Sequence, residues 1–234
     1  LSAPWVLTLY PGILSVRGAI GGLFCGRIST GLHLGTIEDR FFGNTREFNL
    51  LWHEIVVISL ESSLMIGLVA SLLGFFLWKV TFLDFISIIS LVMATMALSL
   101  IFVPPITMAV SILSFKRGLD PDVIVYPIMS TIADIMVTIC YIFVLSLFFS
   151  FESGQYIIWL VDSLFSLFTL LILFREFRET DFLRAVKESF LTLIIVVFIV
   201  NVTGLTLFEI SEAVHSRREM YMVYPALIDT VGDV

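Results

Sequence analysis

The stretch FISIISLVMATMALSLIFVPPITMAVSILS, residues 85–114, contains no charged side chain. A helix that crosses the hydrocarbon core of a bilayer needs about 20 consecutive, mostly apolar residues, so this stretch predicts a transmembrane helix. Apolar residues follow one another here instead of alternating with polar ones, which argues against a strand of a membrane barrel. Pro104 and Pro105 interrupt the hydrogen-bond ladder of the predicted helix, and we expect them to kink it.

Similar apolar segments recur on both sides of this stretch. Each is long enough to span a bilayer, and a seventh segment opens near residue 221. The sequence therefore predicts an all-α, polytopic transmembrane helical bundle, a multi-pass protein of the cell membrane whose surroundings are the lipid bilayer. The other five segments lie at residues 5–33, at a stretch that includes the uncharged run 62–78, and at 123–151, 156–174 and 189–208.

The composition supports the same class. Of the 234 residues, 59% are hydrophobic and 14% are charged, and the mean hydropathy of +1.05 is too high for a water-soluble domain. The net charge of −7 excludes a nucleic-acid partner, because phosphate binding needs a basic face. Cys25 and Cys140 stand in apolar stretches with no metal-binding spacing, so we expect small buried side chains.

Lysine and arginine are distributed unevenly between the connections. The connections 34–50, 115–121 and 175–188 hold eight of these residues, and the alternate ones hold three. Short loops rich in lysine and arginine remain in the cytoplasm, so we expect the first set to be cytoplasmic. The stretch REFRETDFLRAVKES, residues 175–189, also predicts a short amphipathic helix lying at the cytoplasmic interface.

The segment YPIMSTIADIMVTIC, residues 126–140, carries the sharpest candidate site. Pro127, Ser130 or Thr131, Asp134 and Thr138 fall on one helical face. A carboxylate in mid-membrane is costly unless it faces a cavity or a partner, so Asp134 is a functional candidate, although a protonated Asp134 bonded to a neighbouring helix is the alternative. Carboxylate, hydroxyl and carbonyl oxygens suit Mg²⁺ or Ca²⁺ rather than Zn²⁺ or Cu⁺.

Other polar residues have blander expected roles. We expect Glu61 and Asp162 to be solvated or interfacial, Asn201 to bond another helix, and Arg27 to extend to the interface. A glycine stripe in the first segment allows close approach of another helix backbone, either for packing alone or beside an ion path. The stripe consists of Gly18, Gly22 and Gly26.

Two stretches far apart in the chain resemble each other. YPGILSVRGAI, residues 10–20, and YPALIDTVGDV, residues 224–234, share Tyr, Pro and Gly at the same spacing. The second lies six spans further along the chain than the first, so both run in the same direction, and a repeat that begins at each would be parallel. We therefore expect two repeats related by an axis along the membrane normal, as in a fused homodimer.

Three motifs together resemble the MgtE family of magnesium channels and transporters, in its two-repeat, solute-carrier form. They are YPGILSVRGAIGGLFCGRISTGLHLG, residues 10–35, KRGLDPDVIVYPIMSTIADIM, residues 116–136, and YPALIDTVGDV. The resemblance implies five-helix repeats in parallel tandem with a linker helix. Residues 1–151 would be helices two to five of the first repeat, 152–180 the linker helix and interfacial segment, and 181–234 the truncated start of the second repeat.

The resemblance also implies a site and a cargo. The family's metal-binding aspartate corresponds to Asp134, with the carbonyl of Ser130 four residues earlier. The family's pore-lining asparagine corresponds to Ala19 in the first repeat, which has no ligating atom, and to Asp233 in the second. The ion would be Mg²⁺ or another divalent cation, transported or bound in the pore. The partner would be the second repeat of the same chain or a second subunit.

We therefore predict transmembrane transport of divalent cations, Mg²⁺ foremost, without enzymatic chemistry. The path would run beside Asp134 and the glycine-rich first segment. One alternative is an intramembrane aspartyl protease, because TVGDV at the end of the chain resembles that family's GxGD motif; Thr230, however, stands where its first glycine belongs. The other alternative is a membrane scaffold that transports nothing, for which replacing Asp134 by Asn would have no functional effect.

Overall fold

The computed structural model describes residues 5–79, 81–150 and 153–213, and this part of the chain forms six helices. The helices are α1 (Trp5–Leu34), α2 (Arg46–Trp78), α3 (Phe82–Lys116), α4 (Pro121–Ser150), α5 (Gly154–Glu176) and α6 (Thr180–Ala213). All six are long and apolar enough to cross a membrane. The predicted all-α, multi-pass bundle is therefore confirmed, and the segment expected near residue 221 lies outside the described residues.

The ends of the helices follow local sequence signals. Thr45 caps α2 by accepting the amide N–H of Phe48, and Thr81 and Asp84 form a reciprocal capping box at the start of α3. Gly35 and Gly118 follow α1 and α3 with φ of 72° and 69°, a conformation that costs glycine nothing. These signals set short turns, so consecutive helices run antiparallel.

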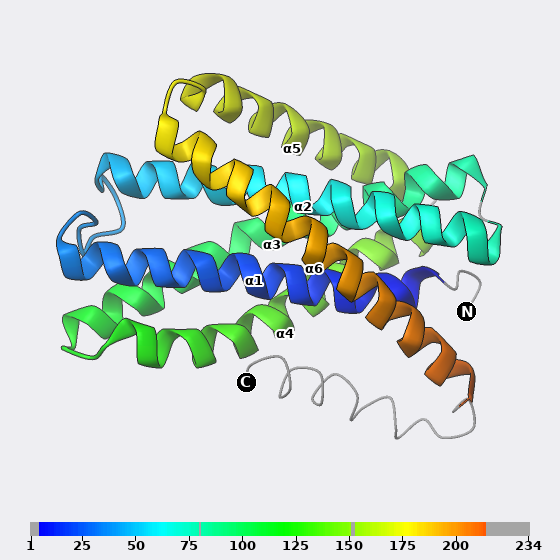
Figure 1. Cartoon of the computed structure of the whole chain (residues 1–234), viewed down its shortest axis with the longest axis horizontal. Coiled ribbons are helices and arrows are strands. Elements are labelled where there is room, and N and C mark those ends of the chain that lie inside the picture. Colours follow the sequence, from blue (N-terminus) through cyan, green and yellow to red (C-terminus); the bar gives the residue numbers. More distant parts are fainter. Residues whose placement is uncertain (1–4, 80, 151–152, 214–234) are drawn as a thin grey trace.

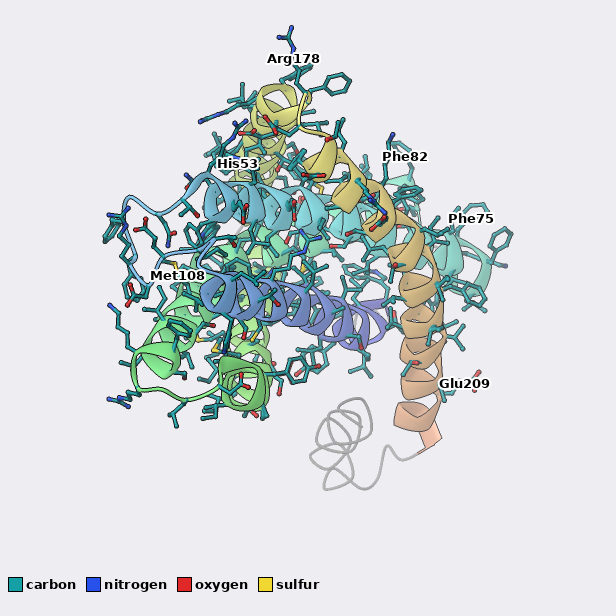
Figure 2. All side chains as sticks on the ribbon, turned by 60° about the vertical axis from the view of Figure 1, so that its left-hand side comes forward. His53, Phe75, Phe82, Met108, Arg178 and Glu209 are labelled. Atoms are coloured by element: carbon teal, nitrogen blue, oxygen red, sulfur yellow. The ribbon has the colours of Figure 1, made fainter. Side chains whose placement is uncertain are left out.

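The bundle has a closed centre and an open periphery. In the most apolar stretch of α2 and of α3, 61% of the residues are buried, compared with 28% in α4, α5 and α6. Figure 1 shows α6 crossing diagonally over α1 and α2, with α5 and α4 on opposite sides of the bundle. Outward-facing phenylalanines such as Phe75 and Phe82, which Figure 2 shows projecting from the bundle, are suited to contact lipid tails.

The turns 35–45, 117–120 and 177–179 gather at one end of the bundle. Figure 1 shows all three at the same end, and two ion pairs join them: Lys116 Nζ lies 3.6 Å from Asp39 Oδ2, and Arg46 pairs with Glu179. The three connections predicted to share one side of the membrane therefore do so. Which side is cytoplasmic stays a prediction.

The separate interfacial helix expected within 175–189 is wrong. α5 ends at Glu176, a short turn follows, and α6 then runs unbroken from Thr180 to Ala213. The physical reason is that this stretch buries one face directly against the bundle, with Phe182 fully buried and Ala185 nearly so. Its charged residues, such as Arg184 and Glu188, form an exposed pair along the other face.

Candidate functional site

Asp134 lies near the middle of α4 and is half-buried. It is the single charged residue between positions 123 and 151. The buried residues of α4 belong to two different clusters. Before Asp134, Val125 and Met129 pack in a small cluster with Cys25. From Ala133 onward, buried residues such as Val137 pack in the main core. Asp134 therefore stands where α4 passes from one packing environment to the other.

The hydroxyl groups on the Asp134 face bond to the backbone of α4 itself. Ser130 Oγ and Thr131 Oγ1 donate to the carbonyl of Pro127 at 3.2 and 3.3 Å, and Thr138 Oγ1 donates to the carbonyl of Asp134 at 2.6 Å. A hydroxyl that donates its proton in this way still has oxygen lone pairs to offer. The face therefore presents oxygen acceptors beside a carboxylate, which is the chemistry that a hard cation needs.

α4 packs against α1, as the sequence predicted. The hydroxyl of Tyr10 lies 2.8 Å from Thr138 Oγ1, Tyr141 Oη donates to the carbonyl of Val6 at 2.5 Å, and the two tyrosine rings stack 5.8 Å apart. An apolar groove of about 250 Å³ lies beside these contacts. Two bonds between α1 and α4 thus fix α4 within about two turns of Asp134.

The glycine stripe of α1 lies largely uncovered. A Cβ atom added to Gly22 would lie 3.0 Å from the ring of Tyr126 on α4, so this glycine permits a close approach. A Cβ added to Gly18 or Gly26 would meet nothing within 4 Å, and Ala19 is exposed. Packing among the described residues explains Gly22 but not the other two glycines of the stripe.

The described residues do not assemble a complete protein cage for a metal. No three His, Cys, Asp or Glu side chains among residues 5–79, 81–150 and 153–213 come together as a metal site. Ser130 lies four residues before Asp134 within α4, and Ala19 offers no side-chain ligand. Asp233 lies outside the described residues.

Two expectations about other polar residues are wrong. Asp162, expected to be solvated or interfacial, is buried at 9% exposure, and its Oδ2 accepts a bond from Ser90 of α3. Asn201 donates to the carbonyl of Val197 in its own helix, and among the described residues it bonds no other helix. Glu61, also expected to be solvated or interfacial, is half-buried, and its Oε2 has no hydrogen-bond donor among the described residues.

Two arginines of α1 make contacts within the bundle that the sequence did not predict. Arg27, expected to extend to the interface, forms an ion pair with Glu54 of α2. Arg17 is 1% exposed at the centre of the bundle and was not singled out at all. A signal was present, because Arg17 is the only charge within residues 1–26, and a charge in mid-membrane is a functional candidate by default.

A group of polar contacts links the helices near the end of the bundle where the three turns lie. His53 Nδ1 lies 3.1 Å from Glu176 Oε1, linking α2 to α5, while Arg27–Glu54 links α1 to α2 and Arg46–Glu179 links α2 to the α5–α6 turn. Arg27–Glu54 and Arg46–Glu179 pair opposite charges, so these contacts serve packing between helices. The cysteines behave as expected: Cys25 and Cys140 are both buried, and they form no disulfide with each other.

Comparison with known proteins supports the family that the sequence motifs predicted. A family described as MgtE, divalent cation transporter, matches residues 10–144, more than half of the chain. Solute carrier family 41 member 3 from mouse and from rat are each 23% identical to it over 98% of its length. The chain spans about half the length of these curated relatives, 47% and 49%. No solved structure matches it. The matched segment contains the glycine stripe, the proline pair of α3 and Asp134, and the chain belongs to the MgtE family of divalent cation transporters.

Proposed function

We propose that this chain forms part of a transmembrane path for divalent cations and that Mg²⁺ is its cargo. The observation that carries the proposal is the half-buried carboxylate of Asp134 near the middle of α4, a helix that packs against the glycine-rich α1, in a chain of this family. A carboxylate in a low-dielectric setting attracts a divalent cation far more strongly than it does in water.

Mg²⁺ gives up its water reluctantly, and it is usually held by one or two carboxylates with several waters retained. Asp134 as the principal ligand, with backbone oxygen from Ser130, fits that requirement without a full protein cage. Asp233, at the position of the family's pore-lining residue, would supply a second carboxylate. The rest of the path would come from the second repeat of the same chain or from a second subunit, on the uncovered side of α1.

The proposal is tested by Asp134→Asn in the full-length protein. Asn keeps the size and hydrogen bonding of Asp but removes its charge, so we expect loss of Mg²⁺ uptake while the protein remains folded in the membrane. Asp39→Asn, at an exposed loop aspartate, is the matched control and should transport normally. Mg²⁺-dependent growth of transporter-deficient cells at equal expression gives the readout. Growth of the Asp134→Asn strain equal to wild type would show that Asp134 is structural and would favour the scaffold alternative.

The orientation of the bundle can be tested separately. We propose that the turn end, with its loops 35–45, 117–120 and 177–179, faces the cytoplasm. Single cysteines at Phe42, which is 92% exposed, and at Ser153, which makes no capping bond, avoid disturbing the loops. Asn44 is a poorer site because its side chain makes four bonds within its loop. A membrane-impermeant thiol reagent applied to intact cells should label position 153 and not 42; the reverse pattern, or labelling of both, contradicts the orientation.

The intramembrane protease alternative has no support from the family, whose members move cations. It needs two aspartates facing each other across a membrane-embedded site. Within the described residues, Asp162 is committed to Ser90 on the α3–α5 side, while Asp134 lies on α4 near α1.

A further inference from the structure

Arg17 carries a charge that the bundle cannot neutralise by proton loss. It lies at mid-length in α1 and is 1% exposed. A guanidinium keeps its proton under all ordinary conditions, and a charge buried in a membrane protein costs several kcal/mol unless it is compensated. A residue this costly needs a role that an apolar side chain could not fill.

The bonds of Arg17 join three helices. Its Nη1 donates to Ser59 Oγ of α2 at 3.3 Å, and its Nη2 donates to the carbonyl of Ser99 of α3 at 3.5 Å. Both bonds are long and both acceptors are neutral. The buried Nε has no acceptor within the described part of the chain. Arg17 therefore has N–H groups that are weakly bonded or lack an acceptor among the described residues, at the junction of α1, α2 and α3.

In α3, two carbonyl groups close to the Ser99 carbonyl lack their usual helical N–H donors. Pro104 and Pro105 lack the N–H groups that would bond the carbonyls of Leu100 and Ile101, and a proline ring also pushes the helix open on that side. In a membrane, freed carbonyls must be satisfied by neighbouring groups. Ser99, whose carbonyl accepts from Arg17, directly precedes the two freed carbonyls.

Beyond the proline pair, α3 and the start of α4 form a hairpin that contributes to two clusters, and its Met108 and Ile112 join the main core. Ile106 and Val110 of α3 pack with Val125, Met129 and Ile132 of α4 and with Cys25 of α1, apart from the main core. This hairpin, residues 106–132, includes Ser130 and ends just before Asp134. The Pro104–Pro105 pair lies inside the continuous helix α3, directly before this hairpin.

We propose that Arg17 is a positioning residue for ion passage: its guanidinium holds α3 at Ser99, just before the Pro104–Pro105 pair, and thereby places the hairpin that leads into the Ser130–Asp134 site. The role rests on the transport function proposed above. Arg17 touches no ion; it acts through the backbone of α3.

The test uses the full-length protein and asks whether restoring the missing N–H groups removes the need for Arg17. Arg17→Gln should lower Mg²⁺ uptake by about tenfold, the size expected for losing a hydrogen bond from a charged donor. Arg17→Lys keeps the charge but cannot span both acceptors, so its uptake should be intermediate. Adding Pro104→Ala and Pro105→Ala to Arg17→Gln should restore uptake. Normal uptake by Arg17→Gln, or a triple variant that stays inactive while Pro104→Ala/Pro105→Ala alone is active, overturns the proposal.

A distance measurement makes the result independent of transport. Spin labels at Leu119, at the tip of the hairpin, and at Phe42, in the neighbouring loop, are both exposed. The wild-type distance distribution should be narrow, Arg17→Gln should broaden or shift it, and the triple variant should return it to the wild-type form. An unchanged distribution in Arg17→Gln refutes the role of Arg17 even where uptake falls.

The same measurement separates this proposal from the transport proposal and covers variants that fail. If wild type shows no uptake but the distances respond as described, the transport function fails and the role of Arg17 in positioning α3 stands. If the Pro104→Ala/Pro105→Ala variant by itself loses uptake, the spin-label distance distributions of Arg17→Gln and of the triple variant test the proposal in place of uptake. If Arg17→Gln is not recovered as folded protein, Arg17→Lys carries the test, and a distribution identical to wild type overturns the proposal.

Discussion

The two sides of α1 differ in what covers them. The side facing α2 and α3 is closed, with Ile13 and Val16 fully buried and the charge of Arg17 enclosed among their neighbours. On the other side, a Cβ added to Gly18 or Gly26 would meet nothing within 4 Å among the described residues, and Ala19 is exposed, although Gly22 of the same stripe lies close to Tyr126. A single helix therefore serves as a core element on one side and as a bare backbone surface on the other.

This difference separates stability from function along one helix. Changes on the closed side must be absorbed by side chains and backbones that already touch, so they should lower stability. Changes on the open side meet empty space in this chain, so their effect should appear only in what the open side does. The predictions below compare the two kinds of site.

The largest effect is expected where α6 crosses α1. A Cβ atom at Gly204 would lie 2.2 Å from the carbonyl oxygen of Thr8, and a backbone atom cannot move aside as a flexible side chain can. We expect Gly204→Ala to cost about 3 kcal/mol, near the upper end for overpacking, and to lower the melting temperature by about 10 °C. Thermal unfolding of purified protein in detergent gives the measurement.

Gly18→Ala is the matched control for Gly204→Ala. Its new methyl group has no neighbour within 4 Å, so the melting temperature should stay within about 2 °C of wild type. Equal destabilisation by the two variants would mean that the open side of α1 is covered after all, and the contrast between the sides would fail.

The second prediction concerns function on the open side. Gly18→Leu should leave the melting temperature unchanged but lower Mg²⁺ uptake, because a large side chain would obstruct whatever completes the path there. An overpacking cost of about 1–3 kcal/mol in the assembled path corresponds to roughly a 5- to 150-fold loss. Thr206→Leu, on an exposed face of α6, should change neither quantity. Wild-type uptake by Gly18→Leu would show that the glycine face is not part of the path.

The helices were predictable because bilayer thickness imposes a length that an apolar run reveals directly. The uncharged stretch 85–114 became α3, Phe82–Lys116, with errors only where polar residues cap the ends. The start of α6 was mispredicted because its charges suggested an interface, whereas Phe182 and Ala185 make it part of the bundle. Charge density along the chain does not report which face of a helix is covered.

The same limit explains what was missed around the site. Asp134 stood out because no other charge occurs near it, and its neighbourhood with α1 followed from the glycine stripe. Asp162 is the ninth residue of α5, about 12 Å from the start of the helix, so counting from the apolar run placed it too near the surface. Arg17 could be found as a charge in the sequence, but its bonds to Ser59 and Ser99 depend on how three helices meet.

The smallest effect is expected for charge pairs, and it compares a covered pair with an exposed one. Glu54 is 7% exposed and pairs with Arg27, which is 44% exposed, whereas Arg184 and Glu188 form an i,i+4 pair on the surface of α6 at 76% and 67% exposure.

Glu54→Gln removes the charge that Arg27 balances inside the bundle. Two features limit the loss: Arg27 can turn toward solvent, and removing the charge relieves repulsion between Glu54 and Asp181. We expect a cost of about 1–2 kcal/mol, less than for a fully buried pair, and a melting temperature lower by about 3–6 °C. Glu188→Gln should have a much smaller effect on the melting temperature, because water and salt already screen its pair. Raising the salt concentration should erase the effect of Glu188→Gln but not that of Glu54→Gln. A Glu54→Gln protein as stable as Glu188→Gln at both salt concentrations would show that the pair linking α1 to α2 contributes no more than a surface pair.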